Sequence, residues 1–158
     1  SWLGREDAFQ RRLAQDLAAA IAAAVAATKA DPSRVCVITE GTCALGAALA
    51  ARADGRIRAL LLASATPSGA ERGWLRAALA EAAVPVFFQQ GPEDVTGNEV
   101  MDRIASLLPP RLVRVADSQS GGSGLALFRA GPAVGQRFSD WVRDQWKSRP
   151  ATPPARRR

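Results

Sequence analysis

The hydrophobic positions at the start of this chain follow a helical spacing. Between residues 5 and 28, large apolar side chains recur at every fourth position and alanine fills the positions between them. This pattern predicts a long amphipathic helix. The large apolar side chains of the stripe are Phe9, Leu13, Leu17, Ile21 and Val25. Asp31-Pro32 ends the segment, because proline disfavours a helical conformation in the residue before it.

Short apolar runs then alternate with helical segments. The runs predict strands over residues 35–38, 56–63, 84–88 and 111–116. The intervening segments predict helices over about 42–53, 71–82, 98–107 and 134–146. Strands that alternate with helices are typical of parallel pairing through right-handed crossovers. The sequence therefore predicts an α/β fold, with a parallel sheet of about four strands and helices on both faces.

The positive charge of the chain is concentrated at its end. The chain holds 21 Lys and Arg against 15 Asp and Glu, but residues 147–158 contribute five basic and no acidic side chains. Without them, 16 basic residues face 15 acidic ones. We therefore expect one nearly neutral domain over residues 1–147 and a disordered Pro/Arg-rich tail over residues 148–158. The tail can contact anionic surfaces, and no specific nucleic-acid partner is predicted.

The segment from residue 35 to residue 46, V-C-V-I-T-E-G-T-C-A-L-G, joins a β-branched strand to a helix through a turn of small residues. Strand, sharp turn and helix form the frame of the nucleophile elbow, G-x-S-x-G. The elbow residues here are Thr39, Glu40, Gly41, Thr42 and Cys43. No serine lies at the centre of this turn, and the chain has no histidine.

In order and spacing, residues 5–146 resemble the C-terminal half of an α/β-hydrolase of the dienelactone-hydrolase type. Strands 35–38 and 56–63 resemble the strands before and after the nucleophile. The segment V-P-V-F-F-Q-Q-G-P-E-D-V resembles the strand and loop that carry the catalytic acid, and R-L-V-R-V-A-D-S-Q-S-G-G-S-G-L resembles the last strand and histidine loop. The elbow also resembles a bacterial group of degenerate α/β-hydrolase-like proteins, often exported, which favours the periplasm or cell envelope.

Carried over position by position, this resemblance leaves most of the catalytic triad unfilled. The apex corresponds to Gly41, the acid to Asp94 and the histidine position to Ser123. Glycine has no nucleophile, and no imidazole is present to move the proton. The resemblance therefore implies a non-catalytic, pseudo-hydrolase module for binding or assembly. A fragment of a larger hydrolase-like protein is an alternative.

Three side chains keep an enzyme alternative open. Cys43 could act as a displaced nucleophile at a helix N-terminus, with Glu40 or Asp94 as its base, in a weak or unconventional ester or thioester hydrolase. The structural interpretations are a small packing residue for Cys43, a solvent-facing loop carboxylate for Glu40, and a capping or loop hydrogen bond for Asp94.

No cofactor and no metal are predicted. Gly41 and Gly46 have the spacing of a phosphate loop, but Lys-Ser/Thr does not follow, and the middle glycine of a dinucleotide fingerprint is missing. Zinc requires more Cys and His than Cys36 and Cys43 provide, and these two cysteines are placed too far apart for a disulfide.

The resemblance also implies that strand 35–38 lacks a neighbour on one side. An exposed apolar edge invites pairing with another chain. We expect this edge to be covered by a homodimer contact, by a separate N-terminal polypeptide, or by the helix at 5–28.

Overall fold

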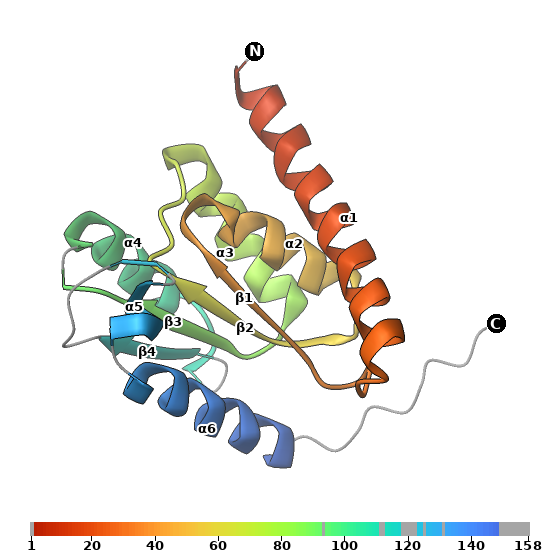
Figure 1. The fold of residues 1–158 in the computed structure, drawn as a ribbon. Coiled ribbons are helices and arrows are strands. Elements are labelled where there is room, and N and C mark those ends of the chain that lie inside the picture. Colours follow the sequence, from red (N-terminus) through yellow and green to blue (C-terminus); the bar gives the residue numbers. More distant parts are fainter. Residues whose placement is uncertain are drawn as a thin grey trace.

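The computed structural model in Figure 1 describes residues 2–92, 94–110, 113–117, 123–124, 126–130 and 132–148. The helices are α1 (Trp2–Thr28), α2 (Ala44–Ala53), α3 (Gly69–Ala82), α4 (Val95–Ser106), α5 (Ala126–Ala130) and α6 (Pro132–Ser148), and a short 3-10 helix, η1 (Gly41–Cys43), precedes α2. The strands are β1 (Val35–Glu40), β2 (Ile57–Ala63), β3 (Val86–Gln90) and β4 (Val113–Asp117).

The strands form one sheet in the order β1-β2-β3-β4, and each neighbouring pair is parallel. Val37 is paired with Leu60, Leu61 with Phe87, and Phe87 with Arg114. The predicted α/β class, with helices packed on a parallel sheet, is confirmed. Because all the strands run in one direction, their carboxyl ends lie along one edge of the sheet.

One face of the sheet is covered by α2, α3 and α4 (Figure 1). Leu60 and Leu62 of β2 belong to this core, together with Leu75 and Leu79 of α3. The small side chains of α2 allow α1 to approach closely, and a Cβ atom on Gly46 would lie only 2.7 Å from Leu13 Cδ2. The alanine-rich composition of α2 is thus what permits a second helix to pack on it.

The other face of the sheet is covered by α6. Ala59, Leu61 and Ala63 of β2 point to this side, because side chains alternate along a strand. Phe87 of β3 contacts two aromatic residues of α6, with ring centroids 5.6 Å from Phe138 and 5.2 Å from Trp141. Both contacts are edge-to-face, the arrangement that aromatic rings favour.

Helix α1 packs against α2 rather than along β1, and its N-terminal end projects past the rest of the molecule (Figure 1). The helix that we expected as one possible cover for the β1 edge therefore lies elsewhere. The predicted apolar stripe is only partly right: Ile21 is buried, whereas Phe9 is 56% exposed. Gln10, the neighbour of Phe9, is buried in its place.

Several predicted boundaries were wrong by a few residues. The first and third strands extend to Glu40 and Gln90, and α4 begins at Val95 instead of residue 98. Helix α5 was not predicted. Of the predicted tail, Ser148 is the last residue of α6, and residues 149–158 lie outside the described residues.

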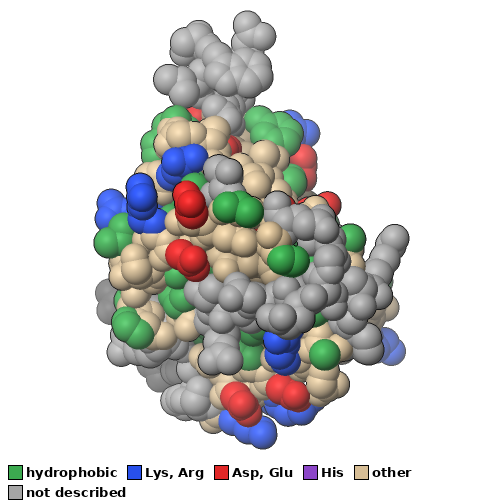
Figure 2. Space-filling view, turned by 90° about the vertical axis from the view of Figure 1, so that its left-hand side faces the viewer, with side chains coloured by type: hydrophobic (Ala, Val, Ile, Leu, Met, Phe, Trp, Pro, Cys, Tyr) green, Lys and Arg blue, Asp and Glu red, His purple; other side chains and the backbone are tan. Residues whose placement is uncertain are grey.

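The surface on the α4 side of the molecule mixes hydrophobic and charged side chains, with basic side chains gathered in the upper left of the view in Figure 2. Among the described residues, no helix combines the length and the apolar character that crossing a membrane requires.

Candidate active site

A cleft of about 620 Å³ lies at the carboxyl ends of the strands. This edge is where open parallel sheets commonly bind their ligands. The cleft is lined by carboxylates, hydroxyl groups and small residues, namely Glu40, Gly41, Ser64, Thr66, Asp94, Ser123, Gly124 and Ala126. These residues come from four separate segments of the chain, so the cleft exists only in the folded protein.

The end of β1 supplies the first wall of the cleft. Gly41 has φ +56°, a left-handed conformation that glycine adopts without steric cost, and as the first residue of η1 it turns the chain sharply after the extended Glu40. The carbonyl oxygen of Gly41 accepts a hydrogen bond from Thr66 N at 3.3 Å. The Glu40 side chain packs against Gly124, where an added Cβ atom would collide with Glu40 Oε2.

Ser64 lines the cleft and forms hydrogen bonds with two other segments of the chain. It follows β2 directly, is 7% exposed and has φ +44°, an uncommon conformation for a residue with a side chain. Its Oγ accepts a hydrogen bond of 2.7 Å from Gly124 N and donates one to Asp94 Oδ2. These hydrogen bonds connect the end of β2 to the start of α4 and to the segment before α5, which stabilises the strained backbone at Ser64.

The structure brings together some of the predicted site residues and separates others. Glu40, Gly41, Asp94 and Ser123 all line the cleft. Thr39, Thr42 and Cys43, by contrast, are not among its lining residues.

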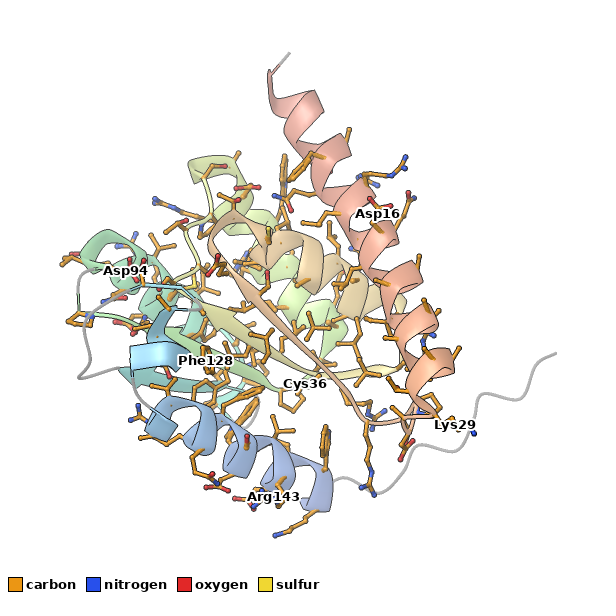
Figure 3. The ribbon with its side chains drawn as sticks, in the orientation of Figure 1. Asp16, Lys29, Cys36, Asp94, Phe128 and Arg143 are labelled. Carbon is orange, nitrogen blue, oxygen red and sulfur yellow. The ribbon has the colours of Figure 1, made fainter. Side chains whose placement is uncertain are left out.

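The surroundings of Cys43 and Asp94 bear on the alternatives that the sequence left open for them. Cys43 ends η1 and is half-buried next to α2, outside the cleft lining. Asp94 stands at the first position before α4 but makes no side-chain cap, because its carboxylate accepts the hydrogen bond from Ser64. Figure 3 shows Asp94 at the α4 end of the sheet.

Sequence reasoning missed Ser64 and Thr66. The segment from Ser64 to Ser68 had the composition of a polar loop, yet Ser64, Ala65 and Pro67 are buried. A signal was present in the sequence, because Ser64 comes immediately after the most apolar strand. Polar residues at the carboxyl end of a parallel strand are placed to face a cleft, as Glu40 and Asp94 are.

The two cysteines are free and lie in different surroundings. The side chain of Cys36, on β1, packs on the side of the sheet that α6 covers. It lies well apart from Asp94 in Figure 3. Burial raises the pKa of the Cys36 thiol to about 12, so this group stays protonated and is a poor nucleophile near neutral pH.

The cleft offers hydrogen-bond donors and acceptors but no imidazole, since the chain contains no histidine. Within the described residues, no three His, Cys, Asp or Glu side chains are grouped as a metal site would require. What the arrangement can do is hold a polar group between the carboxylates of Glu40 and Asp94 and the hydroxyls of Ser64 and Thr66.

Comparisons of the chain with protein-family models, with curated proteins and with solved structures gave no match.

Proposed function

We propose that this chain is a non-catalytic α/β-hydrolase-like module that acts by assembly, through pairing of β1 with a second copy of the chain. The apex position holds Gly41, and the chain has no histidine at the end of β4 or elsewhere. A cleft with hydroxyls and carboxylates alone lacks the usual proton carrier of a serine or cysteine hydrolase.

The open edge of β1 is the observation that carries this proposal. Strand β1 comes first in the sheet order, and β2 is its only neighbouring strand among the residues that the structure describes. Ile38, in the middle of β1, is 47% exposed. Apolar edge strands pair readily with other strands, and a two-fold contact would join two copies of β1 in an antiparallel arrangement.

Replacing Ile38 by lysine is expected to weaken self-association by about tenfold or more, because a charged side chain on an edge strand opposes strand addition. Ile38→Thr is the matched control, since threonine retains strand propensity and adds no charge. Sedimentation equilibrium of the full chain over a range of concentrations measures the effect. A wild-type chain that stays monomeric and folded at high concentration would contradict assembly through β1.

Ester hydrolysis is the second candidate function, and the hydrogen bond between Ser64 and Asp94 favours it. In that reaction Ser64 Oγ would attack the ester carbonyl and pass its proton to Asp94, which would protonate the leaving alcohol. Water would then hydrolyse the acyl-serine. Cys43, the nucleophile suggested by the sequence, lies outside the cleft lining.

Turnover of p-nitrophenyl acetate by the wild-type chain, Ser64→Ala and Cys43→Ala separates the two candidates. A non-catalytic module gives the same rate for all three proteins, equal to that of an unrelated protein of similar composition. Activity lost only in Ser64→Ala would establish the serine hydrolase, and activity lost only in Cys43→Ala would establish the thiol as nucleophile.

A further inference from the structure

A second concave surface lies between α3 and α4, away from both the cleft and the β1 edge. This groove has a volume of about 270 Å³ and is lined by Arg72, Gly73, Arg76, Glu99, Val100, Arg103, Ile104 and Leu107. Its volume falls just below the range of about 300–1,000 Å³ for sites that bury a whole small molecule. The groove therefore suits a few side chains of a larger partner.

The apolar floor of the groove follows α4. Val100, Ile104 and Leu107 recur at the spacing that places residues on one face of a helix. Ile104 is buried against the core, whereas Leu107, directly after α4, is 60% exposed. A large apolar side chain left in solvent at the end of such a row extends the floor outward and offers a contact for another chain.

The rim of the groove is basic. Arg72 and Arg76 lie one helical turn apart on α3, and Arg103 faces them from α4. None of the three forms an ion pair with an acidic residue that the structure describes. Among the described residues of the lining, Glu99 is the single acidic one, so their net charge is positive. Several Lys or Arg side chains lie close together on the α4 side of the molecule in Figure 2.

Gly73 leaves open space in the part of the groove that α3 lines. It lies inside α3 between the two arginines, where glycine is the least favourable residue other than proline. A Cβ atom at this position would meet nothing within 4 Å, so close packing inside the protein does not explain the glycine. Its effect is to leave the α3 wall of the groove without a side chain at the position between Arg72 and Arg76.

We propose that this groove binds an acidic amphipathic helix of another protein. Such a helix presents one row of apolar side chains, which would contact Val100, Ile104 and Leu107, beside a row of carboxylates, which would pair with the arginines. The groove follows α4 for about two turns, which matches the contact length of a short helix. The C-terminal segment of this chain cannot serve as the occupant, because residues 147–158 are basic.

A fluorescein-labelled peptide of about 15 residues, made of Glu, Leu and Ala in amphipathic order, is a suitable probe. Fluorescence anisotropy at low salt would measure its binding to the full chain. We expect the peptide to bind about tenfold more tightly than a scrambled peptide of the same composition. We expect Arg76→Glu to weaken binding by about tenfold, and Gly73→Leu, which fills the groove, to do the same.

Matched variants distinguish binding in the groove from the effects of net charge and of folding. Arg137→Glu makes the same charge change on α6 and should alter binding by less than about threefold. Gly73→Ala should retain binding and confirm that α3 tolerates a side chain. Three outcomes would each overturn the proposal. The scrambled peptide could bind as tightly as the amphipathic one, Arg76→Glu and Arg137→Glu could weaken peptide binding equally, or the peptide could fail to bind. Binding to equimolar phosphatidylcholine–phosphatidylglycerol vesicles that depends on Arg76, while the peptide does not bind, would overturn it as well.

Discussion

Replacing Phe87 by alanine is expected to lower the free energy of unfolding by about 3–5 kcal/mol, among the largest effects of any single substitution in this chain. Phe87 is 1% exposed at the centre of the sheet, and its ring contacts both Phe138 and Trp141. The substitution removes the apolar area of the ring, leaves a cavity between β3 and α6, and deletes two edge-to-face contacts.

The measurement is denaturation in urea, followed by circular dichroism and by tryptophan fluorescence, with the slope of the transition compared between proteins. Phe9→Ala is the matched control, because the same side chain is 56% exposed on α1. That control should change stability by no more than about 0.5 kcal/mol. Equal losses for the two variants would mean that α6 does not pack on the sheet as described.

The order of helices and strands could be predicted because the strands are nearly continuous apolar runs. Leu60, Leu61 and Leu62 are all buried, with alternate side chains serving the two faces of the sheet. A strand covered on both faces has to be apolar at every position, and this makes it conspicuous in a sequence. The boundaries were less predictable, because polar residues such as Glu40 and Gln90 still belong to the ends of their strands.

The buried face of α1 was harder to predict, since a spacing of four residues is not the period of the helix. Each such step turns the side chain by about 40° beyond a full turn, so a stripe drawn from Ile21 back to Phe9 rotates away from the core. Three helical turns correspond to about 11 residues, the separation of Ile21 from Gln10. Gln10 therefore lies above Ile21 on the buried face, and Phe9 faces solvent.

The position of the cleft could be predicted in part, whereas its hydrogen bonds could not. Glu40 ends β1 and Asp94 follows β3, and parallel strands bring their carboxyl ends to one edge. The hydrogen bonds of Ser64 join it to Asp94 and Gly124, which lie 30 and 60 positions further along the sequence. Contacts over such distances depend on how the strands pair and how the loops pack, and no local pattern of polar and apolar residues encodes them.

Glu71→Ala is expected to destabilise the protein by about 2–4 kcal/mol, because this buried carboxyl group satisfies two donors at once. Glu71 is 1% exposed on α3. Its Oε2 accepts a hydrogen bond of 2.9 Å from Ser68 N, which completes the capping box of α3. Its Oε1 accepts one of 2.7 Å from Gln10 Nε2, and the same nitrogen donates to the Thr42 carbonyl at 3.1 Å.

Gln10 is thus the contact through which the projecting end of α1 is held to both α3 and the elbow. Loss of the carboxyl group would leave the buried amide short of a partner and free this end of α1. Glu81→Ala, on the same helix, is the matched control. Glu81 is exposed and forms an ion pair with Arg52, so its loss should cost less than about 1 kcal/mol.

A double-mutant cycle of Gln10→Ala and Glu71→Ala separates the anchoring of α1 from the capping of α3. We expect a coupling energy of about 1–3 kcal/mol from urea denaturation, since the two side chains bond directly inside the protein. Hydrogen exchange should show faster exchange at the start of α1 in both single variants. Additive losses, with α1 exchange unchanged, would show that Glu71 stabilises only its own helix and that α1 is held by its other contacts, such as those of Leu13, Leu17 and Ile21.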